Sequence, residues 1–243
     1  MRILPVIDLK GGLVVRGVAG RRQEYRPVVS RLTPSSRPID VAGAFRDHLG
    51  LDHLYLADLD AIAGAAPALE LYADLRALGF HLWIDAGLRD EESAWPVVEA
   101  GPDRIVAGLE TLAGPAALTG LCRRLGRRVV FSLDLKDGRP LGDMAGWKGL
   151  DPQSLAEEAL AQGVQSLILL DLARVGLGAG TGTEDLALRL VKRHPEVAVA
   201  IGGGVRDGQD LLRIKRLGVS SVLVASALHD GRITRNDLEA LGP

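Results

Sequence analysis

The sequence has one cysteine, no long apolar segment and no signal-peptide pattern. Because Cys122 is alone among 243 residues, an intrachain disulfide is excluded and a thiolate zinc site lacks a second cysteine. Charge or glycine interrupts every apolar run well before the roughly 20 residues that a membrane-spanning helix needs. Asp8 and Lys10 lie inside the first apolar run, unlike a secretory signal. We therefore expect a cytoplasmic protein with no membrane segment.

The sequence also has little net charge and few histidines. The 29 Lys and Arg residues nearly balance the 31 Asp and Glu residues, so no general field draws the chain onto nucleic acid. The five histidines show no close ligand spacing, and no metal is expected. A length of 243 residues fits one barrel-sized domain. The sequence leaves the oligomeric state open, and a monomer is favoured.

Eight short runs are apolar throughout rather than alternating, which is typical of strands covered on both faces. They cover residues 3–8, 53–58, 81–85, 104–108, 129–134, 166–171, 197–202 and 221–225. Amphipathic stretches lie between them, several ending at glycine as helices do: residues 67–79, 90–100, 115–126, 152–163, 183–194 and 209–218. Eight such units predict an α/β fold, a (β/α)8 TIM barrel, although an open doubly wound sheet has the same local pattern.

Short segments of the first half recur in the second half. Residues 7–12 are echoed by residues 133–138, and residues 56–59 by residues 169–172. The third pair is Leu88-Arg89-Asp90 and Val205-Arg206-Asp207. Because the matches keep the same order, we predict a single domain built from two half-barrels, approximately residues 1–126 and 127–243.

Carboxylates end several of the predicted strands. Asp8 and Asp134 end the first and fifth strands, so they stand on opposite sides of the barrel at the rim where barrel enzymes hold their active sites. Such a pair suits a reaction in which one group takes a proton and another gives one. Asp58 and Asp171 end the second and sixth strands, where a substrate contact and a loop cap are equally good interpretations.

A run of glycines follows the seventh predicted strand. Gly203 and Gly204 allow backbone amides to approach an anion closely, and Ala225 and Ser226 offer further N–H groups after the eighth strand. In barrels, the loops after strands 7 and 8 are the recurrent phosphate site. We therefore predict phosphate binding here.

The corresponding place in the first half is different. Asp85, Gly87 and Gly108 occupy the turns after the third and fourth strands. Because a carboxylate repels phosphate, either Asp85 turns away from the ligand or this side receives something else.

Taken together, these residues resemble the histidine-biosynthesis barrels, which comprise a phosphoribosyl-formimino-aminoimidazole-carboxamide ribotide isomerase and the cyclase subunit of imidazole glycerol phosphate synthase. The resemblance covers essentially the whole chain and is closest to the isomerase. It is carried by residues 5–9, 15–16, 57–61, 131–134, 146–147 and 202–205.

The resemblance implies an Amadori rearrangement, in which a phosphorylated ribosyl-amine changes from aldose to ketose without metal or organic cofactor. It implies that Asp8 is the general base and Asp134 the general acid. Trp147 matches a family tryptophan that stacks on the substrate, and an anchor for its loop is an equal alternative. Arg16 stands where the cyclase has lysine, and Asp171 matches an acidic residue of the sixth strand, so both are candidate substrate contacts.

The chain departs from the isomerase where that enzyme binds its second phosphate, which leaves the role of Gly87 and Gly108 open. A divergent paralogue acting on a singly phosphorylated substrate in another pathway is therefore an alternative, and a non-catalytic metabolite-binding barrel is a third. Arg21, Arg22 and Arg26 lie in the long loop after the first strand. This loop either closes over an anionic substrate or is a solvated basic segment.

Overall fold

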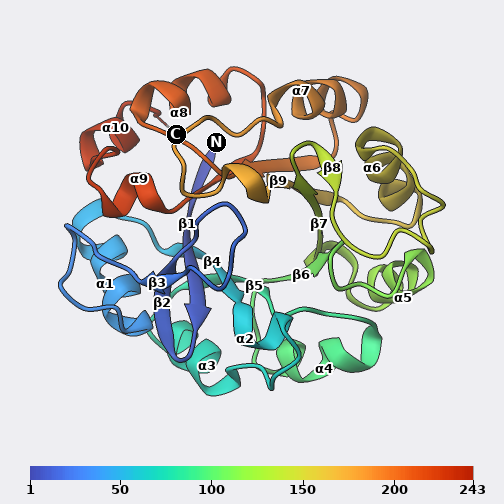
Figure 1. Ribbon diagram of the computed structural model, residues 1–243, viewed down its shortest axis with the longest axis horizontal. Coiled ribbons are helices and arrows are strands. Elements are labelled where there is room, and N and C mark those ends of the chain that lie inside the picture. The colour runs from blue at the N-terminus through green and yellow to red at the C-terminus, as the bar shows by residue number, and fades with distance from the viewer. Residues whose placement is uncertain (243) are drawn as a thin grey trace.

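The computed structural model describes residues 1–242 and shows a closed parallel barrel inside a ring of helices (Figure 1). The barrel strands are β1 (Arg2–Lys10), β4 (His53–Asp58), β5 (His81–Asp85), β6 (Arg104–Gly108), β7 (Val129–Lys136), β9 (Ser166–Asp171), β10 (Ala198–Gly202) and β11 (Ser221–Val224). Each strand pairs in parallel with the next, and β11 pairs with β1. The predicted (β/α)8 fold is confirmed, because an open sheet would leave those two strands as edges.

The helices lie between the strands along the chain. They are α1 (Pro38–Leu49), α2 (Leu59–Ile62), α3 (Leu69–Ala77), α4 (Glu91–Glu99), α5 (Pro115–Leu125), α6 (Pro152–Ala161), α7 (Glu184–Arg193), α8 (Gly208–Lys215), α9 (Ser226–His229) and α10 (Arg235–Glu239). The six predicted helices correspond to α3 through α8, whereas α1 has no counterpart among them. Gly79, Gly163 and Gly218 follow their helices at positive φ, as C-terminal caps require. Among the described residues, no helix has the length and apolarity to cross a membrane.

The uniformly apolar strands are buried on both faces. In β7, Phe131 and Leu133 belong to the large apolar layer between strands and helices, whereas Val130 belongs to a smaller cluster inside the barrel. That inner cluster takes side chains from all eight strands: Leu4, Tyr55, Trp83, Val106, Val130, Ile168, Ala200 and Leu223. Burying one such side chain contributes about 1.5–3 kcal/mol. The two layers together fix the register of every strand, because a shift by one residue would exchange the two faces.

Two short antiparallel additions lie at the mouth of the barrel. The chain leaves β1 through β2 (Leu13–Arg16) and β3 (Arg26–Pro27), and β8 (Arg139–Pro140) folds back onto β7. The segment between β2 and β3 crosses toward the opposite side of the mouth, where the N–H of Ala19 donates to the carbonyl of Val175 at 2.8 Å. This loop therefore partly covers the opening of the barrel.

Candidate active site

Three strand-end carboxylates point into one cavity at the carboxyl ends of the strands. Asp8, Asp85 and Asp134 each follow a residue of the inner cluster on the same strand, β1, β5 or β7, by an even number of positions. Their side chains therefore face the inside of the barrel. All three line one cavity at the mouth of the barrel. Asp8 and Asp134 come from opposite halves of the chain, as the sequence analysis predicted, and Asp85 adds a third acid between them.

Asp58 and Asp171 lie on the outward-facing side of their strands. Asp58 is in register with Leu9 of β1, and Asp171 with Leu135 of β7, and both leucines belong to the outer apolar layer. Residues in register on parallel strands share a face, so neither carboxylate reaches the cavity.

Asp171 instead stabilises the loop after β7. Its carboxylate accepts hydrogen bonds from the N–H groups of Asp137 at 3.1 Å, Gly138 at 2.8 Å and Ala173 at 3.0 Å. This corrects the expectation of a substrate contact at Asp171, because its side chain is occupied by backbone amides outside the cavity. Asp58 likewise accepts bonds from two backbone amides and from the Tyr72 hydroxyl.

The environment of the two facing carboxylates suits proton transfer. Burial raises the pKa of Asp8 from 3.8 to about 7, although the Arg22 guanidinium lowers it. Burial and the Asp85 carboxylate raise the pKa of Asp134 to about 7, although a 2.7 Å bond from the Ser132 hydroxyl lowers it. Near neutral pH, each group is therefore present both as acid and as base, which is the condition that general acid–base catalysis favours.

The third carboxylate is held by two donors. Asp85 accepts a hydrogen bond from the Gly87 N–H at 3.1 Å and another from the Tyr55 hydroxyl at 3.2 Å. Burial raises the pKa of Asp85 to about 6, although both hydrogen bonds lower it. Gly87 itself does not line the cavity, because it packs against Ile62, and only its neighbour Asp85 faces inward.

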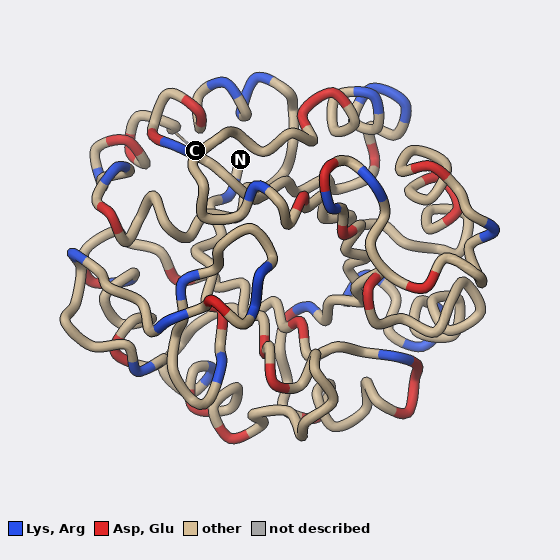
Figure 2. The backbone as a smooth tube through the Cα atoms, in the orientation of Figure 1, with Lys and Arg blue, Asp and Glu red and all other residues tan. Residues whose placement is uncertain are grey.

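The loop after β1 adds Arg22, the one arginine among the described cavity-lining residues. Figure 2 shows both basic and acidic segments of the backbone around the centre of the molecule. Arg22 binds Glu110 of the loop after β6 through two contacts of 2.9 and 2.5 Å. The ammonium of Lys10 supports the loop by donating to the Arg22 carbonyl at 2.6 Å. We call the Arg22–Glu110 pair the clasp, since it joins two loops across the mouth.

Sequence reasoning missed four polar lining residues: Tyr25, Tyr55, Glu110 and Thr111. The position of Tyr55 could have been predicted from the alternation of side chains along a strand. Tyr55 lies an odd number of residues before Asp58, so it faces inward when Asp58 faces outward. Tyr25 and Glu110 lie in loops, and no strand pattern places a loop residue over a cavity.

The opposite end of the cavity is lined by the glycine turn after β10. Gly203 and Gly204 have φ values of 81° and 84°, and within residues 1–242 neither N–H has an acceptor. The Gly204 carbonyl accepts the Gly180 N–H at 2.9 Å, and a Cβ on Gly204 would stand 2.5 Å from the Gly180 oxygen. Only glycine fits there. We call Gly203, Gly204, Ala225 and Ser226 the glycine end, and all four line the cavity.

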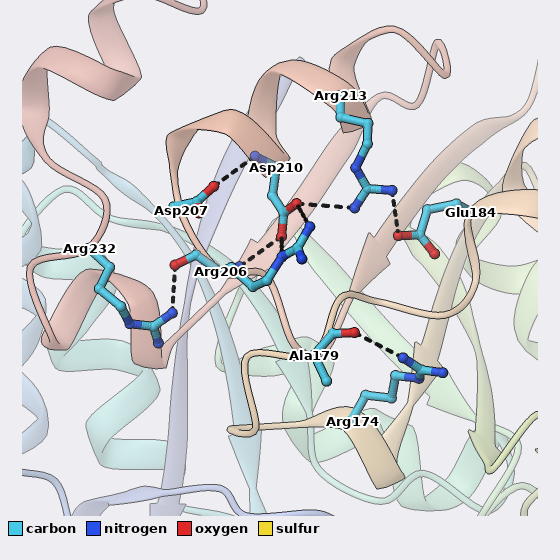
Figure 3. Close-up of polar contacts among 8 residues, drawn as sticks. All are labelled: Arg174, Ala179, Glu184, Arg206, Asp207, Asp210, Arg213 and Arg232. Atoms are coloured by element: carbon cyan, nitrogen blue, oxygen red, sulfur yellow. Dashed lines mark hydrogen bonds and ion pairs between the residues drawn. The ribbon is translucent and has the colours of Figure 1, made fainter.

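Charged residues in the segments before and after the glycine turn form hydrogen bonds and ion pairs with one another (Figure 3). Asp210 at the start of α8 binds the Arg206 guanidinium and backbone, and Arg232 donates to the Arg206 carbonyl. Arg174 similarly supports the loop after β9 by donating to the Ala179 carbonyl at 2.9 Å. These arginines hold the turn but do not line the cavity, so an anion there would be bound by backbone amides.

Two predicted substrate contacts lie away from the cavity. Trp147 is 1% exposed and packs on Phe131, with 5.5 Å between ring centroids, on the outer face of β7. Arg16 is paired with Asp230 through contacts of 2.6 and 2.8 Å. The placement of Arg16 corrects the expectation that it faces the ligand, and the placement of Trp147 favours the loop anchor over stacking on the substrate. Gly108 does line the cavity. Within residues 1–242, no group of three or more His, Cys, Asp or Glu side chains is arranged to hold a metal ion.

Comparison with known proteins agrees with this architecture. A family model described as "Histidine biosynthesis protein" matches residues 2–234. The 1-(5-phosphoribosyl)-5-((5-phosphoribosylamino)methylideneamino)imidazole-4-carboxamide isomerase of Desulforudis audaxviator is 30% identical, covering 99% of this chain and 91% of the relative. The enzyme of that name from Parasynechococcus marenigrum is 32% identical, with coverages of 96% and 90%. An uncharacterised protein of Methanocaldococcus jannaschii is also 32% identical, with coverages of 99% and 97%.

Proposed function

The chain belongs to the histidine biosynthesis protein family, and from this premise we propose that it isomerises a phosphorylated ribosyl-amine from aldose to ketose. The observation that carries the proposal is the pair Asp8 and Asp134, which face one cavity from opposite sides with the glycine end beside them. The isomerase relatives bear the name of the same reaction class.

The chemistry follows from two carboxyl groups that each exchange a proton near neutral pH. A protonated carboxyl donates its proton to the ring oxygen as the C1–O bond breaks, and the nitrogen lone pair forms a C1=N iminium. The ionised carboxylate then removes the C2 proton, that electron pair becomes the C1=C2 bond of an enaminol, and the C1=N pair returns to nitrogen. Loss of the C2 hydroxyl proton forms the C2=O bond while C1 takes up a proton, which gives the ketose. Each positioned carboxyl contributes about 10²–10⁴-fold to the rate.

We assign Asp8 as base and Asp134 as acid on the family resemblance. The Arg22 guanidinium lowers the pKa of Asp8, which favours its ionised form, whereas the Asp85 carboxylate raises the pKa of both groups. The contact with Arg22 therefore supports the same assignment.

The glycine end supplies the phosphate site in this proposal. The N–H groups of Gly203 and Gly204 have no acceptor among the described residues, and neither glycine carries a Cβ that would keep an anion away. The Ser226 hydroxyl lines the same part of the cavity. The clasp lies above, where it excludes water from the reacting carbons when substrate is bound.

The test is turnover of a panel of N-substituted 5-phosphoribosylamines in deuterated water, followed by NMR. The panel contains the two-phosphoribosyl ribotide named for the relatives and N-alkyl compounds with one phosphate. We expect at least one member to give a ketose that carries solvent deuterium at C1. If no member turns over at high enzyme concentration, the chain is a binding barrel and the proposal fails.

A further inference from the structure

Four backbone amides opposite the glycine end are already used by the protein. The Gly87 N–H binds Asp85, and the Leu109 N–H binds the Ser132 carbonyl at 2.9 Å. The N–H groups of Thr111 and Leu112 both donate to the Gly108 carbonyl, at 3.1 and 3.0 Å. We call Asp85, Gly108 and Glu110 the carboxylate end, since all three line the cavity there. A phosphate at this end would find no free amide among these four groups.

The charge at the carboxylate end is also wrong for a second phosphate. A Cβ placed on Gly108 would stand 3.1 Å from an Asp134 oxygen and 3.8 Å from an Asp85 oxygen, so two carboxylates flank this strand end. Arg22, the one cation among the described cavity-lining residues, is bound bidentately by Glu110, which offsets its charge. A phosphate dianion here would therefore meet more negative than positive charge.

Asp85 nevertheless retains acceptor capacity for a ligand. Each of its oxygens has two lone pairs, and each accepts one bond, from the Gly87 N–H or from the Tyr55 hydroxyl. One acceptor position per oxygen is thus left, and the side chain lines the cavity. A group that donates hydrogen bonds and carries no negative charge fits these positions.

We propose that the carboxylate end selects a hydrogen-bond-donating nitrogen group, and that Asp85 makes the enzyme specific for phosphoribosyl compounds with a single phosphate. The inference rests on the proposed function and deepens it, because it names what the non-phosphate end of the substrate carries. Asp85 acts on specificity and takes no part in the proton transfers.

The experiment uses three stable ketose products with one common core, 1-alkylamino-1-deoxyribulose 5-phosphate. Their alkyl arms end in an amine, a hydroxyl or a phosphate, and binding to the full chain is measured by titration calorimetry. We expect the amine-ended compound to bind at least tenfold more tightly than the phosphate-ended compound, with the hydroxyl between them. Equal affinities, or tightest binding of the phosphate-ended compound, would overturn the inference.

The variant Asp85→Gly frees the Gly87 N–H and removes one charge. We expect the ratio of the affinities for the amine-ended and phosphate-ended compounds to fall by at least tenfold in this variant. The control Asp60→Asn removes a charge from an acid that does not line the cavity, and it should leave that ratio unchanged. An unchanged ratio in Asp85→Gly would refute the role of Asp85. If that variant does not fold, Asp85→Asn keeps the side-chain volume and is held to the same criterion.

Failure of the inference is distinguishable from failure of the proposed function. If all three compounds bind equally, the ribulose phosphate is recognised and only the selection at the carboxylate end is wrong. If none binds, the proposed function fails with it.

Discussion

The glycine end and the carboxylate end share a backbone frame but use their amides in opposite ways. Gly87 and Gly204 both have left-handed backbones, with φ of 69° and 84°, and each packs against the loop of the preceding unit. Asp90 and Asp207 then cap the following helices with nearly equal φ, −161° and −160°. Within residues 1–242 the N–H groups of Gly203 and Gly204 have no acceptor, whereas at the other end Asp85 occupies the N–H of Gly87.

The difference shows that two turns with similar backbone conformations can present different groups to the cavity. Asp85 is placed two residues before Gly87, and the residue two before Gly204 is Gly202, where a Cβ would lie 2.8 Å from Leu223. A single side chain, that of Asp85, thus occupies an amide in one turn, whereas the corresponding amide of the other turn has no acceptor within residues 1–242. The following experiments test this contrast, beginning with the chemistry that lies between the two ends.

The largest effect is expected from the facing carboxylates. Asp8→Asn and Asp134→Asn each remove one proton-transfer group, so kcat/KM should fall about 10²–10⁴-fold. Inorganic phosphate should still bind, because the glycine end is untouched. The matched control is Asp58→Asn, an outward strand-end acid, which should lower the melting temperature but spare most of the activity. Equal losses in all three variants would contradict an active site between Asp8 and Asp134.

The next largest effect is expected from alanine at the two glycines with left-handed backbones, because the two variants should differ in phosphate affinity. Gly204→Ala and Gly87→Ala both create backbone clashes, at 2.5 and 2.6 Å, so each should destabilise the fold by about 1–3 kcal/mol. Only Gly204→Ala should also weaken inorganic phosphate binding, by about tenfold. Chemical denaturation measures the first effect and titration calorimetry the second. A parallel loss of phosphate affinity in Gly87→Ala would mean that both turns bind anions.

Stability should depend on pH through the carboxylate end. Burial raises the pKa of Asp85 from 3.8 to about 6, so between these values the folded chain binds more protons than the unfolded chain. The stability that protonated Asp85 contributes is therefore fully present below about pH 4 and is lost as the pH rises through 6. The free energy of unfolding of Asp85→Asn should exceed that of the wild type by about 1–3 kcal/mol at pH 8, and by little at pH 4.

Thermal unfolding from pH 4 to 8 measures this difference. Ser226→Ala at the glycine end removes no titrating group, and its melting curve should stay parallel to that of the wild type. A constant offset between Asp85→Asn and the wild type across this range would show that Asp85 keeps an ordinary pKa in the folded protein.

Much of this arrangement was predictable because strands are periodic. The eight apolar runs became the eight barrel strands, and the phase of each run decides whether its last acid faces the cavity or the helices. Asp8 and Asp134 follow that rule, and so does the outward position of Asp171, which its place at a strand end alone did not reveal. The family membership and its isomerase relatives are likewise confirmed.

Contacts made by loops could not be predicted from the periodicity of strands. The bond between Asp85 and Gly87 and the clasp of Arg22 with Glu110 depend on backbone paths that have no period. The same limit applies to Trp147, which lies in the loop between β8 and α6. Its two interpretations differ only in which side of β7 the ring occupies, and a loop sequence carries no phase to decide that.

The smallest effect is therefore expected from Trp147→Phe. The ring packs on Phe131 outside the barrel, and its indole N–H has no partner among the described residues, so phenylalanine keeps most of the apolar contact and removes a buried unpaired donor. We expect the unfolding free energy to change by less than about 1.5 kcal/mol and KM to stay within about threefold, which is about 0.7 kcal/mol. A larger rise in KM with unchanged stability would show that the ring leaves Phe131 and reaches the substrate between the two ends.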